Sequence, residues 1–176
     1  MGTITRVFSN FVVSHTHTHS FHAYGNAIAG ATSGTWTVIP LQNENFDNGG
    51  CFNNTASSTT LNGLTAPAYS FTPNVAGKYK FESRIVGFDN GNTIGNCRVG
   101  IYRNGTRMAG GYQFVVAGGT TYMRHFDADL FATYDANGTG DYFQIYYYIT
   151  GSSTLYLSAD GDTPQGISFR ATRILE

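Results

Sequence analysis

The sequence has little charge and no long hydrophobic run. Charged residues are 12% of the 176 residues and the net charge is −1, so no strong positive field attracts nucleic acid or an anionic membrane. No hydrophobic stretch approaches the roughly 20 residues that span a bilayer, and the first residues lack the continuous hydrophobic core of a signal peptide. We therefore predict no nucleic-acid partner, no membrane insertion and no signal-peptide-directed export.

Cysteines and catalytic motifs are also scarce. Cys51 and Cys97 are too few for a disulfide framework, and we expect two small buried residues. The sequence contains no nucleophile elbow, no phosphate-binding loop and no zinc-protease helix. We therefore predict that the protein is not an enzyme.

Two sets of acidic residues leave a binding role open. His125, Asp127 and Asp129 alternate and therefore share one face of a strand, either as a metal or acid–base group or as a solvated, hydrogen-bonded face. Aspartates in loops rich in glycine and asparagine either bind calcium or, as we prefer, stabilise turns. These loop aspartates are Asp135, Asp141, Asp160 and Asp162.

Aromatic residues and glycine dominate what is present. Aromatics are 15% of the chain and glycines number 22, and aromatic or β-branched segments broken by glycine and asparagine are typical of a β-sandwich or barrel. Roughly eight to ten strands with turns about every 8–12 residues favour an antiparallel sandwich. We predict an all-β jelly roll without helices. The expected strands are 36–41, 68–71, 78–87, 96–103, 106–116, 122–134, 142–150, 154–158 and 167–175.

The composition divides the chain into an arm and a domain. Residues 1–35 are polar and rich in histidine and glycine, and they contain one hydrophobic patch, formed by Phe8, Phe11, Val12 and Val13. A patch of this size cannot form a core by itself and needs a partner surface. We predict an extended N-terminal arm at 1–35 and a single jelly-roll domain at 36–176.

The segment SFTPNVAGKYKF (70–81) resembles the jelly-roll head shared by the complement globular-head domain and the tumour-necrosis-factor (TNF) superfamily. In that family a strand ending in Phe leads into a turn with Pro and Gly and then a Tyr-x-Phe strand. Pro restricts such a turn and Gly permits a positive φ. The corresponding residues are Phe71, Pro73, Gly77, Tyr79 and Phe81.

Three further segments follow in the family's order. They are VGIYRNG (99–105), GDYFQIYYY (140–148) and SFRATRI (168–174), so the resemblance covers about residues 36–176. Arg170 and Ala171 stand where the family's last strand usually has Gly after its Phe. The form FTPxVAGxYxF is more similar to bacterial and bacteriophage members than to animal ones.

The resemblance implies a homotrimer whose sandwiches pack around a threefold axis through aromatic-rich faces. Tyr146, Tyr147 and Tyr148 are consecutive, so their side chains emerge alternately on the two faces of a strand. One face fills the sandwich and the other either meets a neighbouring subunit or remains half exposed in a monomer. The predicted interface residues are Tyr79, Phe81, Tyr146 and Tyr148.

The segment SHTHTHSFH suggests a metal site. In an extended strand His15, His17 and His19 share one face, with neighbours about 6.5–7 Å apart, too far for one strand to surround a metal whose ligands lie at about 2.0–2.1 Å. Three copies around an axis provide a ring of imidazoles suited to a transition metal, similar to the rings of phage fibre tips. The alternative is a polar arm without metal, and no other cofactor is predicted.

These inferences lead to a structural virion protein of a bacteriophage. The first hypothesis is a trimeric capsid cement or decoration protein that binds the major capsid protein or other virion proteins through its arm, is made in the host cytoplasm and resides in the virion. The alternative is a tail-fibre or receptor-binding tip that recognises a host-surface glycan or protein through exposed aromatic and amide side chains such as Trp36. A secreted cytokine-like or lectin-like module is a third, weaker class.

Overall fold

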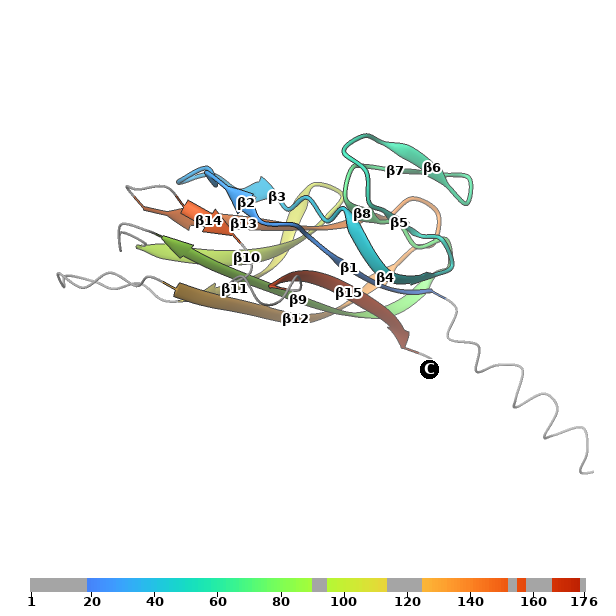
Figure 1. Ribbon diagram of the computed structural model, residues 1–176. Coiled ribbons are helices and arrows are strands. Elements are labelled where there is room, and N and C mark those ends of the chain that lie inside the picture. The colour runs from blue at the N-terminus through green and yellow to red at the C-terminus, as the bar shows by residue number, and fades with distance from the viewer. Residues whose placement is uncertain (1–18, 90–94, 114–124, 152–154, 158–165, 175–176) are drawn as a thin grey trace, which may run out of the picture.

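The computed structural model describes residues 19–89, 95–113, 125–151, 155–157 and 166–174, which form strands and turns. The strands follow the long axis of an elongated, two-layered sandwich (Figure 1), and the named strands pair antiparallel throughout. The described part contains no helix capable of crossing a membrane. The predicted all-β antiparallel sandwich is confirmed.

The larger layer, sheet A, is organised around one long strand. Its strands are β1 (Ser20–Tyr24), β2 (Ile28–Ala29), β4 (Asn43–Asn48), β9 (Gly77–Asp89), β12 (His125–Ala136), β14 (Leu155–Leu157) and β15 (Ile167–Ile174). Strand β9 pairs with β12 along one edge and with both β15 and β14 along the other. Beyond β15 follow β1 and then β4, so β12 and β4 lie at opposite edges of the sheet.

The second layer, sheet B, has the order β11-β10-β13-β8-β5, and β3 also pairs with β13. Its strands are β3 (Thr37–Val38), β5 (Phe52–Asn53), β8 (Ser70–Phe71), β10 (Asn96–Arg103), β11 (Thr106–Gln113) and β13 (Phe143–Thr150). A separate hairpin of β6 (Thr59–Leu61) and β7 (Leu64–Ala66) lies at the upper right in Figure 1.

Turn residues act as the sequence predicts. Asn104 and Gly105 have φ of 53° and 78°, and they join β10 to β11 as the expected Asn-Gly hairpin turn. Gly77 has φ of 146° and begins β9, as its place in the TNF-like motif requires. Strand β10 spans Asn96–Arg103, the range expected from the sequence.

Fifteen strands are assigned in the described residues, more than the roughly eight to ten expected from turn spacing. Several of the additional strands have two or three residues and show no alternation. Strand β4 lies in a polar segment expected to be a loop, and β6 and β7 flank the turn Asn62-Gly63. The Asn62 amide attaches this hairpin to the sandwich by donating to the carbonyls of Gly49 and Gly50, at 2.8 and 2.9 Å.

The predicted boundary between arm and domain at residue 36 requires a correction. Strand β1 pairs with β15 and β4 in the interior of sheet A. The Phe21 ring is fully buried and stacks on Phe52 and Phe71, with centroids 4.7 and 4.6 Å apart. Residues from Ser20 onward therefore belong to the sandwich, while 1–18, with the patch of Phe8, Phe11, Val12 and Val13, lie outside the described residues.

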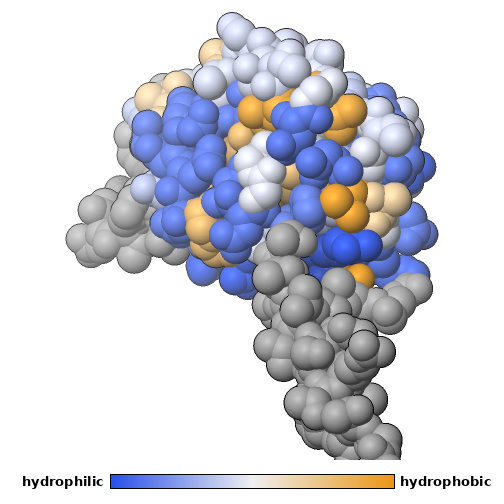
Figure 2. Space-filling view, turned by 90° about the vertical axis from the view of Figure 1, so that its right-hand side faces the viewer, coloured by the Kyte–Doolittle hydropathy of each residue, from blue (hydrophilic) through white to orange (hydrophobic). Residues whose placement is uncertain are grey.

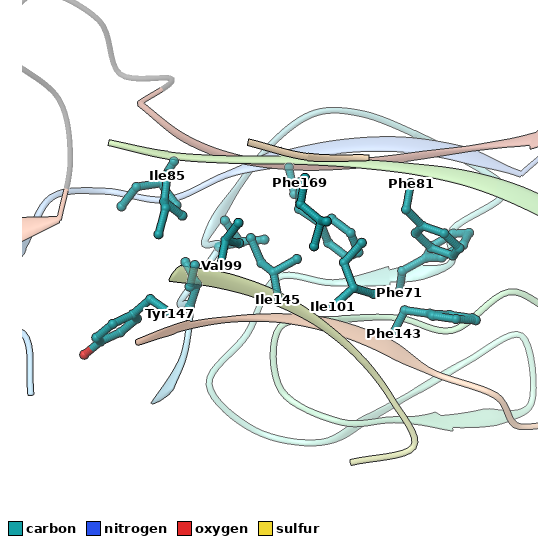
Figure 3. Close-up of a cluster of buried hydrophobic side chains, with 14 of the residues drawn as sticks. Phe71, Phe81, Ile85, Val99, Ile101, Phe143, Ile145, Tyr147 and Phe169 are labelled. Atoms are coloured by element: carbon teal, nitrogen blue, oxygen red, sulfur yellow. The ribbon is translucent and has the colours of Figure 1, made fainter. Parts of the chain in front are cut away.

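The core lies between the two sheets (Figure 3). Inward side chains of β9 and β15 meet those of β10 and β13, and the Phe81 ring contacts the Phe143 ring at a centroid distance of 4.5 Å. Aromatic pairs at such distances add to the free energy gained by burial alone. The residues labelled in Figure 3 are Phe71, Phe81, Ile85, Val99, Ile101, Phe143, Ile145, Tyr147 and Phe169, all buried.

Candidate functional site

Figure 2 shows the end of the sandwich that lies on the right in Figure 1, where hydrophobic residues form small patches separated by hydrophilic ones. The outward faces of the two sheets carry more organised sets of side chains. These two faces are the candidate interaction surfaces.

Five side chains form a continuous row across the outward face of sheet A. Strand pairing places Phe46 opposite His22, His22 opposite Arg170, Arg170 opposite Glu82 and Glu82 opposite Phe131. Directly opposed residues project to the same face and interact. We call this set the sheet A row: a phenylalanine at each edge with charged and polar groups between them.

The charges in the sheet A row are paired within the sheet. The Glu82 carboxylate accepts from the Arg170 guanidinium and lies 2.6 Å from the Lys80 ammonium. Burial by itself raises the pKa of Glu82, but the Lys80 hydrogen bond and the Arg170 charge outweigh it, so the pKa is lowered from its ordinary value. Solvent screens such pairs, and each contributes about 0–1 kcal/mol.

His22 occupies the middle of the row. Its Nδ1 lies 3.0 Å from the Asn45 amide nitrogen, and the Phe46 ring packs edge-on at a centroid distance of 6.2 Å. Burial, followed by the nearby Arg170 charge, lowers the pKa of His22, although Glu82 opposes the shift. An amide donor at Nδ1 places the proton of the neutral ring on Nε2.

Exposed hydrophobic side chains concentrate on this same face. Phe131 is 64% exposed, Phe46 43% and Ile174 38%, and Ile174 pairs with Lys78 at the end of β15. Single exposed hydrophobic residues are ordinary. Phe46 and Phe131 leave hydrophobic surface exposed at both edges of this face.

Four aromatic rings form a cluster on the outward face of sheet B. Tyr102 stacks on Tyr146 at a centroid distance of 4.0 Å, and Trp36 lies 5.4 Å from Tyr148 and 6.0 Å from Tyr102. We call Trp36, Tyr102, Tyr146 and Tyr148 the aromatic cluster. All four are partly exposed.

Two arginines border the aromatic cluster. The Arg107 guanidinium lies 5.1 Å from the Trp36 ring centroid and the Arg98 guanidinium 5.5 Å from that of Tyr148, within the range of cation–π attraction. The Arg98 Nε also donates to the Asn96 side-chain oxygen at 3.1 Å. Tryptophan, tyrosine and arginine are the residues that most often dominate binding energy at interfaces.

The predicted interface set divides between core and surface. Tyr146 and Tyr148 point outward, whereas Tyr147 is buried and its hydroxyl accepts from the Thr32 amide at 3.2 Å, as expected for three consecutive tyrosines. Tyr79 and Phe81 have no exposed surface in the single chain, so they cannot contact a neighbour. They face inward because charged residues such as Lys80 occupy the other side of β9.

Tyr79 has a structural role. Its hydroxyl donates to the Val75 carbonyl at 2.9 Å, and burial raises its pKa to about 12. The ring therefore remains neutral in the core and stabilises the turn before β9.

Of the three predicted metal ligands, only His19 lies in the part of the chain that the structure describes. His15 and His17 lie outside the described residues, and within these residues no group of three or more His, Cys, Asp and Glu side chains is placed to hold a metal. His19 has φ of 79°, and its Nδ1 is buried without a hydrogen-bond partner. Metal binding by His15, His17 and His19 remains a prediction.

Only some of the acidic candidate residues lie in the part of the chain that the structure describes. Both Asp141 carboxylate oxygens accept hydrogen bonds, from the Asn104 side chain at 2.7 Å and the Asn137 amide at 2.9 Å. This agrees with turn stabilisation rather than calcium binding. Asp129 is exposed and Asp135 lies 3.9 Å from Lys78, while Asp160, Asp162 and the side chains of His125 and Asp127 are outside the described part.

Both cysteines are free and buried, as predicted. Burial raises the pKa of the Cys97 thiol and, as the largest cause, that of Cys51 as well. Raised pKa values keep both thiols protonated and unreactive.

Sequence reasoning missed the sheet A row and the arginines of sheet B. The row joins residues from five strands, and no local pattern indicates that Phe46 and Phe131 belong to one face. Arg98 and Arg107 lie on two strands of a predicted hairpin, so the Asn-Gly turn was a signal for their proximity. Their positions over Tyr148 and Trp36 depend on pairing with distant strands.

Solved structures of other proteins share this architecture. The TNF protein Eiger from S. frugiperda superposes with a TM-score of 0.59 at 9% identity, covering 90% of this chain and 93% of that one. Murine APRIL at pH 5.0 superposes with a TM-score of 0.57 at 10% identity, covering 89% and 98%. No protein-family model and no curated protein sequence matches the chain. The chain therefore has a TNF-like jelly-roll fold.

Proposed function

We propose that the chain is a non-enzymatic, homotrimeric structural protein of a bacteriophage particle, and specifically a capsid cement or decoration protein. It is made in the host cytoplasm and resides in the virion. The observation that carries the proposal is the outward face of sheet A, which exposes Phe131, Phe46 and Ile174 although the core between the sheets is complete without them. A second and a third copy of the chain are the occupants we assign to this face.

The positions of the two phenylalanines favour a closed ring. Phe131 lies on β12 and Phe46 on β4, at opposite edges of sheet A. A contact between two different patches closes into a ring when the rotation per subunit fits. Three subunits, each using one edge against the next, bring every Phe131 and Phe46 into an interface, and the TNF-like fold supports this number.

The charge arrangement of the row is compatible with burial. An unpaired charge taken out of water is costly, whereas a charge that keeps its partner and its hydrogen bonds loses much less. Glu82 already holds both Arg170 and Lys80, and the pKa of His22 is lowered, which favours its neutral form. Glu82 therefore requires no new charged partner when the face is covered.

Three features support a phage particle. Charged residues are only 12% of the chain, which suits a subunit fixed in an assembly better than a protein dissolved alone. The segment 70–81 is more similar to bacterial and bacteriophage members of the jelly-roll family than to animal ones. The patch of Phe8, Phe11, Val12 and Val13 precedes the sandwich and supplies the capsid contact in this proposal.

Light scattering of the purified chain tests the trimer. We expect a mass three times that of the 19.1 kDa chain, and Phe131→Ser should shift it to the monomer because it replaces the most exposed phenylalanine of the row. Met108→Ser is the matched control, since Met108 is 38% exposed but lies in sheet B. A monomeric wild type, or equal dissociation by both variants, would contradict the proposal.

Capsid binding tests the cement role. Capsids assembled without this chain should bind the added trimer. Capsids that carry the trimer should then resist heating better than bare capsids. Replacing the four residues of the arm patch by serine should abolish attachment while the trimer persists. A trimer that leaves capsids unchanged contradicts the cement role.

A tail-fibre or receptor-binding tip is the second candidate, and the aromatic cluster favours it. Exposed tyrosine, tryptophan and arginine side chains are typical of recognition surfaces. Such a protein should bind host cells and block infection, which a cement protein should not do.

A further inference from the structure

We propose that the aromatic cluster, together with Arg98 and Arg107, is a binding site for an acidic oligosaccharide, a chain of uronic or sialic acid units. The inference rests on the second candidate function and names the ligand class of that surface. It requires neither the trimer nor the capsid, because every residue involved belongs to one chain and one sheet.

Backbone hydrogen bonds to β13 hold the segment that carries Trp36. The segment that contains it runs beside β13, where the Gly34 amide donates to Ile149 at 2.8 Å and the Ile39 amide donates to Ile145 at 3.0 Å. Thr37 pairs with Tyr147, so Trp36 falls opposite Tyr148 on the outward face. The backbone is therefore held on both sides of Trp36, and its ring packs against Tyr102 and Tyr148. A side chain held in this way loses little conformational entropy when a ligand binds.

Gly100 lies beneath the rings. A Cβ at this position would come within 3.1 Å of Trp36 and 3.2 Å of Tyr102, closer than side chains tolerate without movement. The missing side chain allows both rings to rest on the backbone of β10. The rings of the aromatic cluster therefore pack together on the outward face and remain partly exposed to a ligand.

The charges on this surface have one sign. Strands β3, β10, β11 and β13 contain neither aspartate nor glutamate, and the two arginines beside their outward aromatic rings are Arg98 and Arg107. Within these strands the charge is therefore positive only. A guanidinium presents paired donors that match a carboxylate, which makes an anion the complementary ligand.

Ring stacking and carboxylate recognition together indicate acidic sugars. Aromatic rings offer flat hydrophobic surface for the C–H face of a pyranose, with weak C–H contacts of the kind proteins use generally. Burial, as the largest cause, raises the pKa of Tyr102, so its hydroxyl remains protonated and able to donate. The Tyr146 hydroxyl donates to the Gln144 side-chain oxygen at 3.4 Å, and this bond orients the Tyr146 ring beside Tyr102.

Single-stranded nucleic acid is the main competitor, because bases also stack on aromatic rings beside arginine. Nucleic-acid binding depends on neutralising many phosphates, and such proteins usually present a basic patch on a basic domain. This chain is slightly acidic overall. We therefore favour the sugar and treat the nucleic acid as an outcome of the test.

Fluorescence titration tests the site, because Trp36 is the only tryptophan in the chain. The probes are tetragalacturonic acid, a sialic acid tetramer and the methyl ester of tetragalacturonic acid as the neutral match. At least one acidic probe should change Trp36 emission saturably and lose affinity as salt rises. Arg107→Gln should weaken that binding about tenfold, the effect of losing one charge-assisted hydrogen bond.

Arg84→Gln is the matched control, since it makes the same change in net charge on sheet A and should leave affinity unchanged. Equal weakening by Arg107→Gln and Arg84→Gln, equal binding of the methyl ester, or no saturable response to either acidic probe would overturn the proposal. Tighter binding of an oligothymidylate would also overturn it and assign the site to nucleic acid. Repeating the titration with Phe131→Ser, the variant expected to be monomeric, tests whether ligand binding depends on the trimer.

Discussion

The outward faces of the two sheets differ in how their charges are balanced. Sheet A brings Glu82 together with Lys80 and Arg170 and places exposed phenylalanines at its edges. Sheet B carries arginines beside aromatic rings, and its strands contribute no carboxylate to them. A face whose charges are already paired can be covered by a copy of itself, whereas a face with charge of one sign favours a ligand of the opposite sign.

The largest predicted effect is the difference in stability between replacing a phenylalanine of the core and replacing an exposed phenylalanine of sheet A. Phe81→Ala should cost about 3–5 kcal/mol of unfolding free energy, because Phe81 is fully buried and packs against Phe143. Phe131→Ala should cost less than about 1 kcal/mol in the single chain, since Phe131 is 64% exposed. Denaturant unfolding of both variants at a concentration where the wild type is monomeric measures the difference. Similar losses would show that Phe131 is part of the core.

Gly100→Ala should disturb the sheet B face selectively. The added methyl group meets Trp36 and Tyr102, so we expect a shift in Trp36 emission and a loss of about 1 kcal/mol from overpacking. Gly110→Ala is the control on the neighbouring strand, where the nearest atom to the added methyl group is the Val99 carbonyl oxygen at 3.8 Å. Identical emission spectra for the two variants would contradict the position assigned to Trp36.

Mild acid should act on sheet A through Glu82. Its folded-state pKa is lowered from the ordinary 4.5, so its contribution to stability is present above that pH and is lost as the pH falls through the folded-state value. Glu82→Gln should cost about 0.5–1 kcal/mol at pH 7 and flatten the dependence of unfolding on pH below about 4.5. Asp129→Asn removes an exposed carboxylate from the same face, and an equal flattening by this variant would argue against a special role for Glu82.

The smallest effect concerns His22. Its folded-state pKa lies below 6.5, so the unfolded chain binds the proton more readily and stability declines as the pH falls below about 6.5. Arg170, Glu82 and the Asn45 amide face this ring, and His22→Gln should remove a few tenths of a kcal/mol of pH dependence between pH 7 and 5. Unfolding curves of variant and wild type across that range measure it, and superimposable pH profiles would refute it.

Local patterns predict much of sheet B. The limits of β10 follow from alternation and from the Asn104-Gly105 turn, whose positive φ values the residue types favour. The segment around Gly77 resembles the TNF-like family, and Gly77 adopts the positive φ that its turn requires, a conformation that few other residues adopt. Such signals are contained in a few consecutive residues.

Strands β1 and β4 escape prediction because neither is hydrophobic enough to indicate a strand. Ser20–Tyr24 follows the histidine run and contains one large core residue, Phe21, and the segment NENFDN is mostly polar. Both become strands because β15 offers a free edge to β1, and β1 then offers its own edge to β4. Pairing with a distant strand overrides weak local propensity.

The sequence by itself determined the fold class, the principal turns and the alternation of side chains along each long strand, because these depend on backbone geometry over a few residues. In β9 the alternation places Tyr79 and Phe81 on one side, but the prediction that this side forms a subunit interface was wrong, because both side chains are buried in the core. Only the tertiary structure decided which of three identical tyrosines enters the core. It also joined Phe46 to Phe131 and set Arg107 over Trp36, because the register between strands far apart in the chain is a property of the whole packed sandwich.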